Sequence, residues 1–213
     1  MQYSTFAAID IGSYDVILEI FEISKKQGIR SVDKICHRME LGKDTYTLGK
    51  IRPEMEEELC RVLADFVRIM EGYRVDDYRA TASSAISEAS NSLYVLGKIH
   101  QLTGLSVTVL SNSEQRFLSY KALAAMEDNF NKIIEKGTAI LDLDGGSFQI
   151  SLFDKDALVT TQNIRMGSLR IRERLAGIQS ETEHYEEMVE ELIWNEVSSF
   201  KKMYLKDRKI ENI

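Results

Sequence analysis

The sequence is poor in cysteine and has no long apolar run. Its two cysteines, Cys36 and Cys60, stand far apart and form no C-x-x-C pair, which disfavours both a disulfide framework and a zinc site. No apolar stretch approaches the roughly 20 residues needed to span a bilayer, and no basic-plus-apolar signal opens the chain. We therefore expect a cytoplasmic protein with no membrane partner.

Positive charge is scarce as well. The chain has 27 Lys and Arg residues against 34 Asp and Glu residues, a net charge of -7. This balance argues against nucleic acid as a partner, because such binding depends on basic surface. An acidic chain that holds a polyanion needs backbone dipoles, a metal ion or a few focused cations instead. With 213 residues, 44% of them hydrophobic, the chain suits one large globular domain or two small ones.

Two segments share one uncommon pattern. Residues 7–21 (AAIDIGSYDVILEIF) and 139–153 (AILDLDGGSFQISLF) each carry an apolar run that reaches an Asp, a turn with Gly and Ser, and a second apolar run. Apolar runs that flank such a turn predict a β-hairpin. Two copies of one hairpin suggest two similar lobes, each of which offers a glycine loop to a shared ligand.

These glycine loops predict phosphate binding. Glycine lets backbone N–H groups approach an anion without a Cβ in the way, and successive N–H groups in a turn form a concave anion site. The Asp that ends each first strand, Asp10 or Asp142, could hold a divalent cation that bridges phosphate oxygens. Such turns can also serve only to close a tight hairpin, but their repetition favours the phosphate site. The loop residues are Gly12, Ser13, Gly145, Gly146 and Ser147.

The rest of the chain alternates strands and helices. Apolar residues at helical spacing predict the helices, the first of which starts at Pro53. Two S-x-x-E capping boxes mark helix starts at residues 111–114 and 180–183. The charged tail is expected to fray. We expect helices at residues 53–71, 84–102, 111–129 and 188–200, further strands at 29–41, 78–81, 106–110 and 158–164, and the frayed tail at 206–213.

A strand meander followed by alternating helices and strands, begun twice, predicts an α/β layered architecture. We place the first lobe at residues 1–128 and the second at 129–213, closely joined because no Pro- or Gly-rich linker separates them. The second copy stops after one helical region. This leaves open a fragment or a natural protein with a reduced second lobe.

Five blocks, in order, resemble motifs of one protein family. AAIDIGSYDVILEI resembles its first phosphate loop, DxGSNSxRL, while ATASSAISEASN resembles TSAxREAxN and LSNSEQRFLSY resembles SGxEEARLxY. LDLDGGSFQISLF is similar to the second phosphate loop, DIGGGSTEL, and MGSLRIRE to GsvRLtE. On these blocks the chain is identified as a member of the Ppx/GppA phosphatases. These are exopolyphosphatases and guanosine pentaphosphate phosphohydrolases within the acetate kinase, actin and chaperone ATPase superfamily.

The resemblance implies a fold and a substrate class. It implies two ribonuclease H-like lobes, each a mixed β-sheet flanked by helices, with an interlobe cleft as the site and an incomplete second lobe. It implies Mg²⁺, for which the candidate ligands are Asp10, Asp142 and Asp144, and polyphosphate or a guanosine tetra- or pentaphosphate as ligand. Arg170 joins the loop residues as a phosphate-binding group. Whether the chain is a monomer or a homodimer is left open.

Departures from the family pattern weaken the expected chemistry. A neutral amide cannot take a proton, and loss of a general base costs about 10² to 10⁴-fold in rate. Two arginines that would bind phosphate oxygens are also missing. The family's glutamates are replaced by Gln115 and Gln149, its arginines by Ile17 and Ser87, and its first glycine of the second loop by Asp144.

The catalytic candidates are Glu114, Gln115 and Gln149. Gln115 could still orient a water molecule, as a glutamine does in small GTPases. Glu114 is the alternative base, but it points about 100° away on the same helix and could simply belong to the capping box.

Three functions stay open on this basis. The first is an exopolyphosphatase-type hydrolase with weakened or altered chemistry, and the second is a catalytically silent sensor of polyphosphate or an alarmone nucleotide. A kinase-like phosphotransferase is disfavoured, because no late glycine motif for adenosine follows Gly167.

Overall fold

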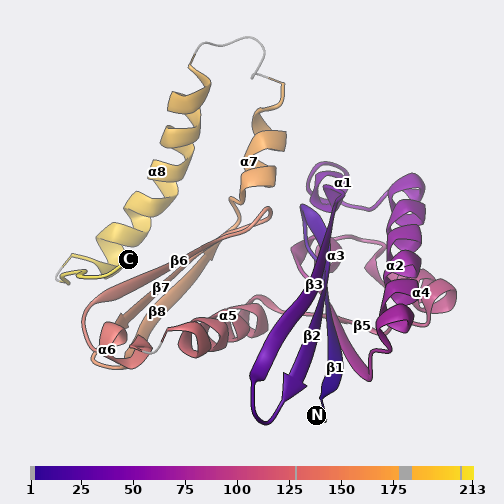
Figure 1. The fold of residues 1–213 in the computed structure, drawn as a ribbon. Helices are drawn as coiled ribbons and strands as arrows, with labels where there is room; N and C mark the ends of the chain where they lie inside the picture. Colours follow the sequence, from indigo (N-terminus) through magenta and orange to yellow (C-terminus); the bar gives the residue numbers. More distant parts are fainter. Residues whose placement is uncertain (1–2, 128, 178–183, 207) are drawn as a thin grey trace. The chain divides into compact units, whose positions relative to one another are not determined.

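The computed structural model describes residues 3–127, 129–177, 184–206 and 208–213. They form two compact units, Met1–Ser111 (unit 1) and Asn112–Ile213 (unit 2) (Figure 1). Among the described residues, no helix has both the length and the apolar character required to cross a membrane.

Unit 1 is built on a mixed five-stranded sheet in the order β3-β2-β1-β4-β5. The central strand, β1, pairs antiparallel with β2 and parallel with β4. Side chains alternate across a strand, so Ala7, Ile9 and Ile11 of β1 are buried on one face. The strands are β1 (Ser4–Ile11), β2 (Asp15–Ser24), β3 (Gly28–Arg38), β4 (Asp77–Ala82) and β5 (Val107–Val109).

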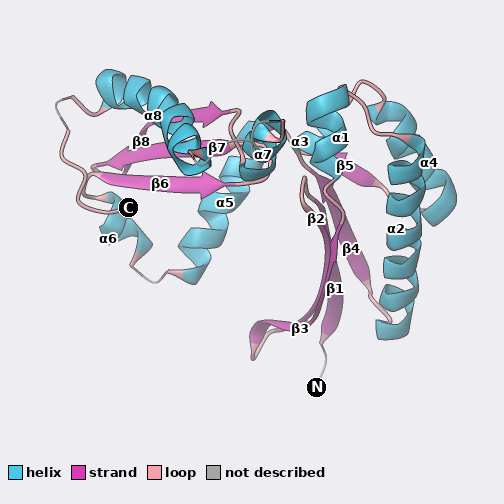
Figure 2. Cartoon of the chain, turned by 90° about the horizontal axis from the view of Figure 1, so that it is seen from above, coloured by secondary structure: helices cyan, strands magenta, loops and turns pink. Residues whose placement is uncertain are grey.

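The helices of unit 1 cover that apolar face. Leu59, Leu63 and Phe66 recur at helical spacing and join the same buried cluster as the β1 residues. The two longest helices lie side by side against the sheet (Figure 2). The helices are α1 (Leu41–Leu48), α2 (Pro53–Tyr73), α3 (Ser84–Ser87) and α4 (Ser92–Thr103).

Unit 2 has helices on both faces of a smaller antiparallel sheet in the order β6-β7-β8 (Figure 1). On one face, Ile150 and Leu152 pack with Leu175 of α7 and Phe200 of α8. On the other face, Tyr120 of α5 donates a hydrogen bond to Ser151. The elements are α5 (Asn112–Met126), α6 (Phe130–Ile134), β6 (Thr138–Leu143), β7 (Phe148–Asp154), β8 (Ala157–Ile164), α7 (Ser168–Leu175) and α8 (Tyr185–Tyr204).

The predicted repeat is present and extends beyond the hairpins. The order β6-β7-β8-α7-α8 repeats β1-β2-β3-α1-α2, and α1 and α7 both have 8 residues. After α2 the chain adds β4 in parallel to β1, and after α8 it forms a parallel bridge between Asn212 and Thr138 of β6. The α/β class, with mixed and antiparallel sheets flanked by helices, is therefore as predicted.

The prediction of a frayed tail was wrong. The Ala139 N–H donates to the Asn212 carbonyl at 2.9 Å, and the Glu211 N–H donates to the Gly137 carbonyl at 2.7 Å. An edge strand exposes unpaired backbone groups, so the edge of β6 offers partners that a charged tail can use.

Several helices also differ from expectation. Helix α5 belongs to the compact unit of β6–β8 rather than to the first lobe. The helix expected at 84–102 is divided, because the Asn91 side chain binds both backbone groups of Ile51, at 3.0 Å and 2.8 Å. Helices α1 and α6 were not predicted. The capping box at 180–183 lies outside the described residues.

Candidate functional site

The two glycine loops close with the same hydrogen bond. The Gly12 N–H donates to the Asp15 carbonyl at 3.0 Å, and the Asp144 N–H donates to the Ser147 carbonyl at 2.9 Å. The strands beside them share a register, in which Asp10 pairs with Ile17 and Asp142 with Gln149. Asp144 therefore stands where unit 1 has Gly12, and Gly145 stands where unit 1 has Ser13.

The carbonyl groups of the second loop point toward α7. The Asp144 carbonyl accepts the Ser168 N–H at 3.1 Å, and the Gly145 carbonyl accepts the Arg170 N–H at 3.1 Å. In a trans peptide the N–H that follows a carbonyl points the opposite way. The N–H groups of Gly145 and Gly146 thus face away from α7, which gives the loop the polarity of an anion site.

Gly167 and Arg170 hold this loop against α7. A Cβ at Gly167 would lie 2.3 Å from the Gly145 carbonyl carbon, so the close approach requires glycine. The Arg170 Nε donates to the Gly146 carbonyl at 2.9 Å. Arg170, predicted to bind phosphate, therefore braces the backbone of the phosphate loop in this structure.

Asp144 folds its side chain back onto its own loop. Its carboxylate accepts the Gly145 N–H. Burial raises the pKa of Asp144, and the nearby Asp142 charge adds to this, while the Gly145 N–H, the Gln115 side chain of α5 and the Gly146 N–H favour the charged form and oppose the rise. A partly buried carboxylate thus sits at the N–H groups that the sequence assigned to phosphate.

A row of oxygen donors crosses the sheet beside this loop. Asp142 pairs with Gln149, and Gln149 pairs with Asn163, so the three side chains lie on one face of neighbouring strands. Gln149 is 3% exposed. Its Oε1 and the Asn163 Oδ1 are buried without a hydrogen-bond partner. Asp142 accepts a hydrogen bond from Ser119 at 3.1 Å.

These oxygens fit a hard divalent cation. No group of three His, Cys, Asp or Glu side chains gathers anywhere in the described part of the chain. One carboxylate with two unsatisfied amide oxygens, however, is the donor chemistry that Mg²⁺ accepts, and an unsatisfied buried acceptor is costly unless something binds it. Asn163 was not predicted, because a register shift between Leu152 and Phe153, rather than regular alternation from the turn, places it opposite Gln149.

The first loop is braced by hydroxyl groups. The Ser13 side chain is fully buried. Its Oγ lies 2.6 Å from the Tyr46 Oη of α1 and 3.2 Å from the Ser84 Oγ of α3, and the latter two atoms are 2.8 Å apart. Gly42 permits this approach, because a Cβ there would lie 2.6 Å from the Tyr46 ring. The Ser13 hydroxyl is therefore used inside unit 1, and neither Tyr46 nor Gly42 was predicted.

The structure gathers the predicted site residues into two groups. Asp10, Gly12 and Ser13 meet at the β1–β2 turn of unit 1, where Asp10 is exposed and Thr81 Oγ1 lies 3.5 Å from its carboxylate. Glu114 is exposed in the first turn of α5. The group at the β6–β7 turn of unit 2 comprises Gln115, Asp142, Asp144, Gly145, Gly146, Ser147, Gln149 and Arg170.

The comparisons with known proteins agree on one family. The model of the Ppx/GppA phosphatase family matches residues 19–211. The chain is 25% identical over 144 residues to Exopolyphosphatase 1 of Mycobacterium leprae, a match that covers 67% of this chain and 41% of that protein. It is 22% identical over 174 residues to the Bifunctional 3-dehydroquinate synthase/phosphatase of Fusobacterium nucleatum, a match that covers 79% and 26%.

The fold has a counterpart among solved structures. The crystal structure of the Aquifex aeolicus Ppx/GppA family member has a TM-score of 0.69 at 23% identity, over 93% of this chain and 63% of that one. The chain thus spans less than half the length of the two curated relatives and under two thirds of the Aquifex chain.

Proposed function

Since the chain belongs to the Ppx/GppA phosphatase family, we propose that it binds the terminal phosphoanhydride of polyphosphate, or of a guanosine tetra- or pentaphosphate, and hydrolyses it weakly. The orientation of the second loop carries this proposal, because its N–H groups face away from α7. Backbone dipoles of this kind are what a chain of net charge -7 needs to hold a polyanion. The compartment we propose is the cytoplasm.

The loop residues bind and orient the phosphate. Gly145 and Gly146 direct N–H groups at the terminal phosphate oxygens, while Arg170 and Gly167 keep the loop rigid against α7. Asp142, Gln149 and Asn163 would hold Mg²⁺, which supplies neutralisation of the phosphate charge when it is bound. The Gln115 side chain favours the charged form of Asp144 at the same loop, where its amide can orient a water molecule.

The hydrolysis is weak because proton acceptors are missing at the expected positions. Gln115 and Gln149 are neutral, and Ile17 stands where the family pattern has an arginine. The Asp144 carboxylate also places a negative charge where the phosphate binds. Positioning and charge neutralisation carry most of phosphoryl-transfer catalysis, so each of these changes lowers the rate.

A phosphate sensor without turnover is the second candidate. The observation that favours it is the pair of neutral amides, Gln115 and Gln149, at two positions where the family pattern has a glutamate. Such a protein keeps the binding loops and loses the chemical step. The two candidates therefore predict equal binding and different turnover.

Phosphate release from long-chain polyphosphate and from guanosine pentaphosphate, each with and without Mg²⁺, tests this proposal. We expect slow, Mg²⁺-dependent release from one of the two substrates. Binding without release would favour the sensor, whereas absence of both binding and release would refute the proposed function. A rate equal to that of a family member with both glutamates would refute the weakened chemistry.

A further inference from the structure

The anion site of the second loop contains a negative charge of its own. The Gly145 N–H donates to the Asp144 carboxylate, and the Gly146 N–H and the Gln115 side chain of α5 also favour its charged form. A phosphate bound at this loop would need the same N–H groups. The side chain and the ligand therefore compete for one set of donors.

The equivalent loop of unit 1 has a glycine in place of Asp144. The same turn hydrogen bond places Gly12 at the position of Asp144. A Cβ at Gly12 would lie 2.9 Å from the Asp15 carbonyl oxygen, closer than a side chain tolerates. In unit 2 this position accepts a Cβ and a carboxylate, so a carboxylate from this turn position distinguishes the second loop from the first.

Building on the proposed function, we propose that Asp144 is an internal competitor of the phosphate ligand: its carboxylate fills the second loop until the ligand displaces it. The displaced carboxylate loses the Gly145 N–H donor. It also remains beside Asp142, whose charge repels it. A free phosphate offers no replacement partner, because it is itself an anion.

A phosphate that binds together with a divalent cation does offer the displaced carboxylate a new partner. Carboxylate oxygens are the ligands that Mg²⁺ prefers, and Asp142 already lies on the neighbouring strand position beside Gln149. The loop with Asp144 thus selects the cation complex of a phosphate chain over the free anion. Removal of the Asp144 carboxylate should abolish this selection and leave the loop open to free phosphate.

Calorimetric titration with inorganic tripolyphosphate in EDTA tests the competition directly. Asp144→Gly reproduces the residue of the first loop, and Asp144→Asn keeps the side-chain shape while it removes the charge. We expect Asp144→Gly to bind tripolyphosphate at least about tenfold more tightly than the wild-type protein, because hydrogen bonds to charged acceptors are among the strongest. Asp144→Asn should lie between the two.

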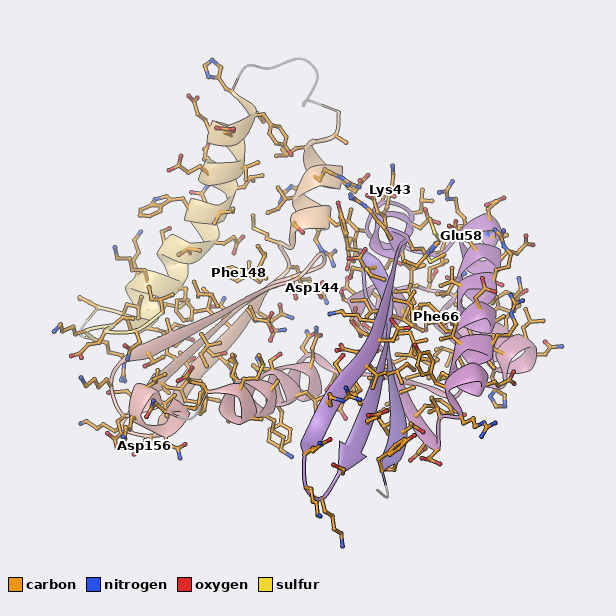
Figure 3. All side chains as sticks on the ribbon, in the orientation of Figure 1. Lys43, Glu58, Phe66, Asp144, Phe148 and Asp156 are labelled. Atoms are coloured by element: carbon orange, nitrogen blue, oxygen red, sulfur yellow. The ribbon has the colours of Figure 1, made fainter. Side chains whose placement is uncertain are left out.

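Asp156→Asn is the matched control. Asp156 lies in the turn between β7 and β8, at the other end of β7 from the loop, and its substitution makes the same change in net charge (Figure 3). The Asp156→Asn variant should bind tripolyphosphate with the affinity of the wild-type protein. Circular dichroism of each variant shows whether it folds, and Asp144→Asn keeps the test valid if Asp144→Gly does not.

The outcomes separate this inference from the proposed function. If the wild-type protein binds tripolyphosphate and both Asp144 variants bind it no more tightly in EDTA, Asp144 only closes a turn and the competition is refuted. The proposed function would survive that result. If no protein binds, with or without Mg²⁺, both the competition and the proposed function are wrong.

Discussion

The two glycine loops share a turn and differ in what holds it. In unit 1 the turn is braced by neutral hydroxyl groups, those of Ser13, Tyr46 and Ser84. In unit 2 charged and amide groups contact the turn: Arg170 binds a loop carbonyl, and the Asp144 carboxylate binds loop N–H groups. The same backbone turn is therefore held by neutral groups in unit 1 and contacted by charged groups in unit 2.

The second loop also differs from the family pattern in where its carboxylate stands. The family pattern places a carboxylate on the helix at residue 115 and glycine at residue 144, and this chain has Gln115 and Asp144. The two side chains contact each other. The two departures are thus one coupled change at a single point of the second loop.

The largest predicted effect follows from that coupling. Gln115→Glu alone should raise phosphate release from polyphosphate only slightly, because it sets two carboxylates side by side. The double variant Gln115→Glu, Asp144→Gly should gain up to about 10² to 10⁴-fold, the range for a restored general base. Residues in contact are not additive, so the gain should exceed the product of the two single effects. Strictly multiplicative rates would show that the residues act independently.

A smaller effect is expected on stability, at the two glycines that let each loop pack closely against its helix. Gly167→Ala should cost about 1–3 kcal/mol of unfolding free energy, because its Cβ meets backbone atoms of the second loop. Gly42→Ala should cost less, because its nearest neighbour is the Tyr46 ring, a side chain that can move. Urea denaturation measures both. Gly97→Ala is the control, since no atom lies within 4 Å of its Cβ position; equal costs at Gly167 and Gly42 would contradict the comparison.

The hydroxyl triangle should contribute to stability and not to phosphate affinity. Tyr46→Phe removes one hydroxyl and leaves Ser13 and Ser84 with a single contact, at a cost of about 1 kcal/mol in urea denaturation. Calorimetry with tripolyphosphate and Mg²⁺ should give the wild-type affinity. A large loss of affinity without a loss of stability would assign the Ser13 hydroxyl to the ligand instead.

The smallest predicted effect is a pH dependence of stability that arises from Asp144 in unit 2. Burial raises the pKa of Asp144 from the usual 3.8, so the folded state binds its proton more tightly than the unfolded state. The stability contributed by this carboxyl is therefore present below pH 3.8 and is lost as pH rises through the raised pKa. The thermal midpoint of Asp144→Asn should fall less with rising pH over this window than that of the wild-type protein. Parallel pH profiles would contradict the raised pKa.

Much of the fold could be predicted because it follows from local periodicity. The hairpins, α2 and α8 come from apolar spacing that needs no partner to be recognised. Helix α1 could not be predicted in this way, because it starts after Glu40 in a left-handed conformation and depends on the contact between Gly42 and Ser13. The tail could not either, since residues 211–212 are held by Gly137 and by the edge of β6, partners that only the tertiary structure supplies.

The site was predictable in composition and not in geometry. The Asp and Gly pattern indicated both loops, and the strand register shows that Asp144 stands in the place of Gly12. The contact between Gln115 and Asp144 joins residues far apart in the chain. The inward turn of Ser13 depends on Tyr46 of α1, so these parts required the tertiary structure.

The most direct test is the affinity of the second loop for a phosphate chain. Calorimetry with tripolyphosphate and Mg²⁺ should show binding by the wild-type protein and none by Gly146→Val, because a branched Cβ fills the space of the anion. Gly97→Val, which places the same side chain in open space on α4, should bind like the wild-type protein. Equal affinity in the wild-type protein and Gly146→Val would contradict a phosphate site at this loop.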